Sequence, residues 1–266
     1  MKYNVENFLQ LQMPNLIKIL GDHKISWTSV NGILERHINN VRDEYNLTEK
    51  IIKKDANFYS ILVERIKGTG KSDGMFDFFN KLFGSLYEIL TEKEKIKINK
   101  IITSVLTSVN KDYLNFIGEL ATLNKFMLTN QYELLNIEEP IHEGNNLTAD
   151  IFLKNKTTEK EILIEVLNLH LEIKEFKEFS NLEYHLKSKL EKKKKDKGVE
   201  NSIKVIVIQP VIWTKDEVQL NFVREFYSKT KFEIENVNEP LVYVTFRLKD
   251  ASFEHHFEYI STVIWH

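Results

Sequence analysis

The feature that most constrains the fold of this chain is a change in the spacing of its apolar residues near residue 110. Before that point apolar side chains recur every three or four residues, for example at Leu16 and Leu20, which is the spacing of an amphipathic helix. After it, short continuous apolar runs such as IKVIVIQ (203–209) alternate with helical segments. The change predicts a helical N-terminal domain over residues 1–110 and an α/β domain over residues 111–266.

The order of elements in the second part can be read from the same periodicities. A helix over about 112–130 precedes a weak strand, ELLNI, and two stronger strand runs, LTADIFLK (147–154) and EILIEVLNLH (161–170). The intervening NKTTEK has a length suited to a hairpin. A helix around LEYHLKSKLEKKKKDK follows, then the buried strand IKVIVIQ, another helix and a late strand, LVYVTFRL. The predicted order is α, β, β, β, α, β, with one added helix and strand.

Two helix starts carry the Ser/Thr-x-x-Glu signature of a capping box, in which two side chains satisfy the first free amides of a helix. One is Thr91 with Glu94, and the other is Ser180 with Glu183. Gly198 is placed to end the second of these helices. We therefore expect helices to begin at both signatures.

Composition excludes several classes of protein. The 266 residues contain no cysteine and have a net charge of −2, with 42% hydrophobic and 29% charged residues. Disulfides, thiolate nucleophiles and cysteine-based zinc sites are excluded, and nucleic-acid binding would require a local basic patch. The N-terminal MKYNVENFLQ lacks the apolar region of a secretory signal, and no apolar run is long enough to span a bilayer. We expect a cytoplasmic protein with no membrane partner.

Three acidic residues lie where an apolar residue would be expected. Glu119 is on the apolar stripe of its helix, Asp150 is inside a strand run, and Glu165 interrupts the apolar run ILIEVLNL. An ionised carboxylate on a buried face is costly unless it is paired, hydrogen-bonded or bound to a metal. Glu119 could instead reach solvent from the edge of its stripe, and Asp150 could lie on an exposed edge. Together the three predict a site for a hard divalent cation, which favours carboxylate oxygens.

The order of these acids and elements, over roughly residues 112–209, resembles the PD-(D/E)XK nuclease superfamily. A helix glutamate is followed by an ADI strand, a hairpin and an IEV strand, with fourteen residues between Asp150 and Glu165. The resemblance implies a restriction-endonuclease-like fold with a central mixed sheet flanked by helices. It also implies Mg²⁺ or Mn²⁺ held by Asp150 and Glu165, assisted by Glu119. The implied activity is hydrolysis of phosphodiester bonds in DNA or RNA, in restriction, repair or defence.

The sequence departs from this family at one position. The lysine expected two residues after Glu165 is replaced by Leu167. Lys154, on the same strand face as Asp150, or Lys187 or Lys189 on the following helix could supply the missing cation. If none does, the domain is a catalytically inactive relative that binds nucleic acid or protein.

Other signals are weaker. GTGKS (68–72) lacks the first glycine of a phosphate-binding loop and follows a helical segment rather than a strand. The basic run KSKLEKKKKDK (187–197) either contacts phosphates or forms the solvated face of a helix. His255 and His256 are adjacent, so on a strand they would point to opposite sides. The helical N-terminal region is expected to bind a partner, a nucleic-acid feature or a second subunit.

Overall fold

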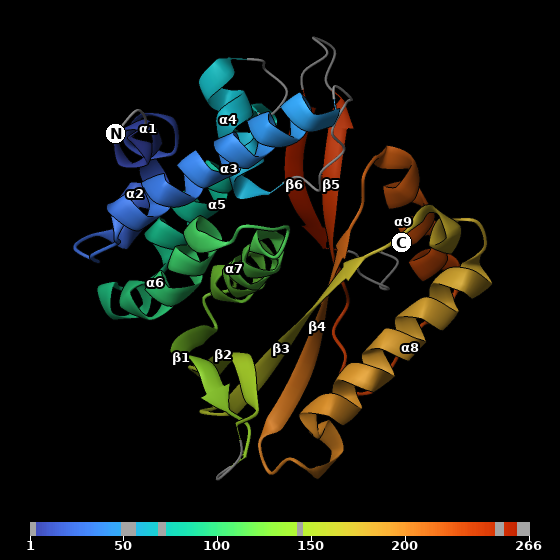
Figure 1. The fold of residues 1–266 in the computed structure, drawn as a ribbon. Coiled ribbons are helices and arrows are strands. Elements are labelled where there is room, and N and C mark those ends of the chain that lie inside the picture. Colours follow the sequence, from blue (N-terminus) through green and yellow to red (C-terminus); the bar gives the residue numbers. More distant parts are fainter. Residues whose placement is uncertain (1–3, 49–56, 69–72, 143–145, 248–252, 260–266) are drawn as a thin grey trace. The chain divides into compact units, whose positions relative to one another are not determined.

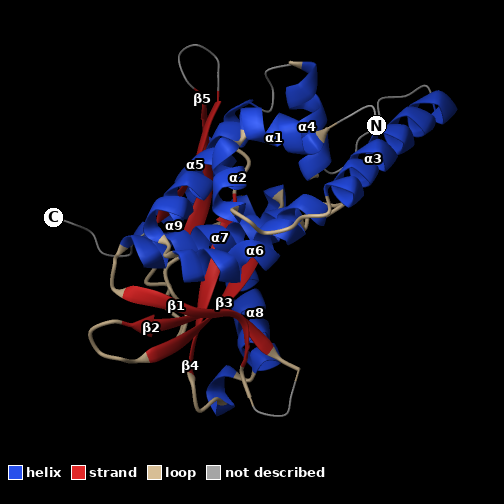
Figure 2. Cartoon of the chain, turned by 90° about the vertical axis from the view of Figure 1, so that its left-hand side faces the viewer, coloured by secondary structure: helices blue, strands red, loops and turns tan. Residues whose placement is uncertain are grey.

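The chain forms two compact units, residues 1–120 and 121–266. The computed structural model describes residues 4–48, 57–68, 73–142, 146–247 and 253–259. Within these ranges every strand follows residue 131, and the first unit is built from helices (Figures 1 and 2). The prediction of an α/β protein with a helical N-terminal region is confirmed.

Among its described residues, the first unit contains six helices that lie wholly within it, and a seventh crosses its boundary. They are α1 (Val5–Gln12), α2 (Pro14–Leu20), α3 (Trp27–Thr48), α4 (Phe58–Lys67), α5 (Asp73–Ile89), α6 (Glu92–Thr107) and α7 (Tyr113–Leu128). The segment before GTGKS is therefore helical, as expected, whereas residues 69–72 of that motif lie outside the described ranges.

The closest approach in the first unit is between α2 and α5. A side chain at Gly84 would place its Cβ 2.6 Å from Asn15 Nδ2, so Asn15 would have to shift. Asn15 donates from its backbone to Asn80 Oδ1 and from its side chain to Asn80 O, at 2.9 and 3.0 Å. These bonds join the two helices where their backbones come together.

The two predicted capping boxes have different outcomes. At Thr91 the box is present, because its backbone amide donates to Glu94 Oε2 at 2.8 Å and its hydroxyl accepts from the amide of Glu94. The second prediction is wrong. Helix α8 (Phe179–Lys197) begins before Ser180, and the residue that precedes it, Glu178, makes no side-chain cap bond. Ser180 is thus inside the first turn, and its hydroxyl donates to Glu178 Oε2 at 3.3 Å.

The strands of the second unit form one mixed sheet in the order β1–β2–β3–β4–β5–β6. They are β1 (Tyr132–Pro140), β2 (Thr148–Asn155), β3 (Glu161–His170), β4 (Val205–Trp213), β5 (Leu241–Arg247) and β6 (Phe253–Tyr259). The first three strands are antiparallel, β3–β4 and β4–β5 are parallel, and β5–β6 is antiparallel. The predicted order is confirmed, and β6 is a strand that the sequence patterns did not predict.

Helices connect the parallel strands, as parallel pairing requires. Between β3 and β4 lie η1 (Ile173–Phe176), α8 and η2 (Val199–Asn201), and between β4 and β5 lies α9 (Glu217–Lys229). Figure 1 shows α8 running alongside β3 and β4. Within the described ranges, no helix has both the length and the apolar character needed to cross a membrane.

One face of the sheet is packed against α8 and α9 in a continuous apolar core. Its α8 contribution is the stripe Leu182, Leu186 and Leu190, all fully buried. The opposite face is polar where β4 meets the end of α7, because Lys125 Nζ donates to the buried Gln209 Oε1 at 2.9 Å. Elsewhere that face is apolar as well, since Ile151, Ile164 and Val211 are buried on it.

Candidate functional site

The β2–β3 hairpin brings Asp150 and Glu165 together. Ile151 pairs with Ile164 in the antiparallel register, and one further step places Asp150 opposite Glu165. The backbone amide of Val166 donates to Asp150 Oδ2 at 2.7 Å. Asp150 thus takes the place of a main-chain acceptor where the β2–β3 ladder ends, and its carboxylate is held beside that of Glu165.

Two lysines of α8 contact the Glu165 carboxylate, which is 1% exposed. Lys193 Nζ lies 2.5 Å from Oε1, and Lys197 Nζ lies 2.9 Å from Oε2. Lys197 also donates to the carbonyl oxygen of Thr148, at the start of β2, at 2.6 Å. Oε2 is buried but accepts no well-formed hydrogen bond, so its contact with Lys197 is an ion pair only. The result is a cluster of two acids and two lysines, which we call the acid–lysine cluster (Asp150, Glu165, Lys193 and Lys197).

The phase of α8 explains why these two lysines face the sheet. Leu182, Leu186 and Leu190 are buried at intervals of four. Lys193 and Lys197 continue that stripe at intervals of three and four, so they point the same way. The helix ends after Lys197, where Gly198 adopts φ of 62° and donates to the carbonyls of Lys194 and Lys195. These lysines could have been found from sequence, because they continue the spacing of the buried leucines on α8.

Burial and charge shift the acidity of Asp150. Burial, followed by repulsion from Glu165, raises the pKa of Asp150 from 3.8 to about 7, and the Val166 amide, Lys193 and Lys197 lower it in part. Two carboxylates that lie together in a poorly solvated place cannot both ionise without cost. Asp150 therefore exchanges a proton near neutral pH, a property that is common at functional sites and also occurs in structural ion-pair networks.

The two lysines expected from sequence have other partners. Lys154 on β2 pairs with Glu159 in the hairpin turn. Lys187 pairs with Glu183 one turn earlier on the exposed side of α8, at 2.5 Å. The amines that contact Glu165 come instead from Lys193 and Lys197. Lys187 was predicted because it is close to β3 in the sequence. The rotation of α8 about its axis instead turns two lysines nearer its C-terminal end toward Glu165.

The structure also places the remaining residues around the predicted site. Glu119 is half-buried on α7 and belongs to the first unit, so its role at this site stays a prediction. Leu167 packs against the apolar core formed with α8 and α9. Asn168 faces the other side of the sheet, where its Oδ1 accepts from Trp213 Nε1 at 2.9 Å. His170 stacks on the same indole.

The cluster contains two carboxylates, the donor type that Mg²⁺ prefers. Among the described residues, no three His, Cys, Asp or Glu side chains are grouped as metal ligands. Mg²⁺ is nevertheless commonly held by only one or two carboxylates, with waters and substrate phosphate completing its shell. Asp150 and Glu165 supply two such groups, and the buried Glu165 Oε2 lacks a hydrogen bond. The donor type is that of a hard dication, although in the structure lysine ammonium groups contact both Glu165 oxygens.

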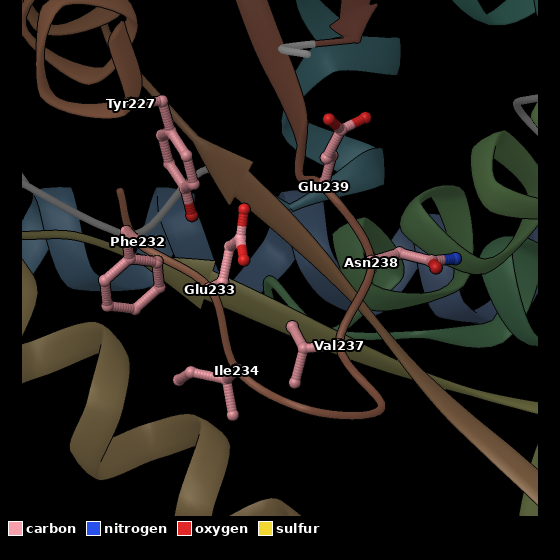
Figure 3. A pocket seen from close by; sticks show the side chains of 7 residues that line it. All are labelled: Tyr227, Phe232, Glu233, Ile234, Val237, Asn238 and Glu239. Carbon is pink, nitrogen blue, oxygen red and sulfur yellow. The ribbon is translucent and has the colours of Figure 1, made fainter. Parts of the chain in front are cut away.

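A separate cavity lies on the far side of β4 from the cluster. Its volume is about 260 Å³, and Figure 3 shows its lining of Tyr227, Phe232, Glu233, Ile234, Val237, Asn238 and Glu239. Val237 is bridged to Ile208, which is the β4 partner of Glu165. Because its charged lining residues are two glutamates, the cavity would repel a phosphate, whereas the acid–lysine cluster offers two cations.

Comparisons with known proteins add no assignment to this geometry. No family model, no curated protein and no solved structure matches the chain.

Proposed function

We propose that this protein is a metal-dependent nuclease that hydrolyses phosphodiester bonds in DNA or RNA. The observation that supports the proposal is the contact of Lys193 and Lys197 with Glu165, opposite Asp150. A PD-(D/E)XK-like site needs two acids and a nearby cation, and here α8 provides the cation that Leu167 cannot. The second unit would then be a restriction-endonuclease-like domain.

In this proposal Asp150 and Glu165 hold Mg²⁺ or Mn²⁺. Such a metal would lower the pKa of a water molecule and neutralise charge on the phosphodiester. Asp150 must lose its proton to serve as a ligand, so its raised pKa makes metal affinity rise with pH through about 7. The lysines compensate the charge of the acids before substrate binds, and they attract phosphate afterwards.

The positive charge of the surface next to the cluster is suited to binding nucleic acid. Lys189 and Lys192, one turn or less before Lys193, are exposed on α8. Because the whole chain has a net charge of −2, attraction for a polyanion must come from such a local patch. The same proposal gives the helical N-terminal region a partner-binding role and places the protein in the cytoplasm, acting in restriction or defence.

The test is a cleavage assay on DNA and RNA with Mg²⁺ or Mn²⁺, comparing wild type with Asp150→Asn and Glu165→Gln. Each substitution keeps side-chain shape and removes one anionic ligand. We expect each to lower cleavage by about 100-fold or more, the usual scale for losing a group that stabilises the transition state. Asp196→Asn, on the exposed side of α8, is the matched control and should cleave as wild type does. Equal cleavage by all four proteins would refute the proposed site.

A second candidate is a nuclease-like domain that binds nucleic acid or protein without cutting. It is favoured by Leu167, which fills the apolar core, and by the two lysines, which already neutralise Glu165. The same assay separates the two functions if it is combined with binding measurements. Binding of DNA or RNA that Asp150→Asn leaves intact, with no metal-dependent cleavage by wild type, would favour this candidate.

A further inference from the structure

The two lysines that contact Glu165 differ in their surroundings. Lys197 lies at the C-terminal end of α8 and touches two strands, through Thr148 O on β2 and Glu165 Oε2 on β3. Lys193 touches one group, Glu165 Oε1; among the described residues, no other hydrogen bond or ion pair involves its amine. Its side chain is 25% exposed, against 18% for Lys197.

We propose that Lys197 is a positioning residue that ties β2 to β3 at the acid pair, and that Lys193 is the cation that contacts the substrate phosphate. This division deepens the proposed nuclease function and rests on it. The contact that carries it is the bridge from Lys197 to Thr148 O, which Lys193 lacks.

The bridge of Lys197 has a defined geometric consequence. Thr148 is two residues before Asp150, and the amide of Val166, next to Glu165, donates to Asp150. An amine held by both strands keeps the start of β2 against β3, and therefore keeps the two carboxylates facing each other. Its backbone is fixed as well, because Gly198 ends the helix directly after it.

The single contact of Lys193 leaves its amine able to move to another partner. When a dication takes the charge of Glu165, Lys193 loses the one group that it contacts and keeps only a longer-range attraction to Asp150, whereas Lys197 keeps the Thr148 carbonyl. A lysine ammonium on a flexible four-carbon chain can then turn to a phosphate oxygen. Lys193 is also the more exposed of the two, so it needs less rearrangement to reach substrate.

The experiment uses the full chain with Lys193→Met and Lys197→Met, which remove charge at nearly constant length. For Lys193→Met we expect kcat at the pH plateau to fall by about 100-fold, with amide exchange at Val166 unchanged. For Lys197→Met we expect plateau kcat to be retained within about 10-fold, because the substrate-contacting cation remains. Its Val166 amide should exchange at least about 10-fold faster relative to amides of β4, since local opening sets exchange.

Lys195→Met is the matched control, because this exposed lysine lies on the same helix and away from the leucine stripe. If Lys197→Met does not fold, Lys197→Gln, which lacks the charge and is shorter than lysine, takes its place with the same expected results. Equal losses of kcat and equal Val166 exchange in the two Met variants would overturn the division of roles. Absence of cleavage by wild type would overturn the nuclease function and the role of Lys193, and Val166 exchange would then decide the role of Lys197 alone.

Discussion

Replacing Asp150 with asparagine should stabilise this protein, and more strongly at alkaline pH. Asparagine keeps an oxygen that can accept from the Val166 amide, but it removes the charge that Glu165 repels. In wild type the folded chain binds a proton on Asp150 more tightly than the unfolded chain does. The destabilisation by this carboxylate is therefore absent below about pH 4 and complete above about pH 7.

The magnitude follows from the shift itself. A pKa raised from 3.8 to about 7, at about 1.4 kcal/mol per unit, corresponds to about 4 kcal/mol above the folded pKa. At about pH 5.5 the folded carboxyl is protonated and the unfolded one is ionised, so the linkage relation gives only about 2 kcal/mol. The advantage of Asp150→Asn should consequently grow by about 2 kcal/mol between about pH 5.5 and 8.5.

The assay is urea unfolding of both proteins at these two pH values, with the slope of the transition checked for constancy. Asp196→Asn on the exposed side of α8 is the control, and its stability should follow that of wild type at both pH values. A stability gain that is the same at both pH values, or a loss at the higher one, would refute the burial and repulsion assigned to Asp150.

Two matched pairs test the rest of the fold. Gly84→Ala should lower the melting temperature although alanine favours helices, because its Cβ would lie 2.6 Å from Asn15 Nδ2. We expect the free energy of unfolding to fall by about 1–3 kcal/mol. Gly32→Ala on α3 meets no atom within 4 Å and should instead stabilise by up to about 1 kcal/mol, so equal effects at the two glycines would contradict the close approach. Thr91→Ala should lower the free energy of unfolding by about 1 kcal/mol, because it removes the cap of α6. Ser180→Ala, inside the first turn of α8, should lower it far less. Chemical unfolding of both variants measures this, and a larger loss at Ser180 would contradict the observed start of α8.

The features that were predictable from sequence are local ones. The six-residue NKTTEK turn and the alternation along β2 and β3 were enough to indicate that Asp150 and Glu165 share a hairpin. The capping box at Thr91 was predictable for the same reason, since its partners are three residues apart. The matching signature at Ser180 failed because α8 starts before it, and a four-residue motif contains no information on where neighbouring packing begins a helix.

The residues that complete the candidate site depended on tertiary structure. Lys193 and Lys197 lie 28 and 32 positions after Glu165, and which lysine reaches it depends on where α8 crosses β3 and on the rotation of the helix. That rotation is set by burial of the leucine stripe against the sheet. Sequence by itself therefore determined the order of elements and the acid pair, because backbone periodicity and turn length are local properties. The position of the cations and the raised pKa of Asp150 were decided only by packing, which sets the distances and the desolvation between elements far apart in the chain.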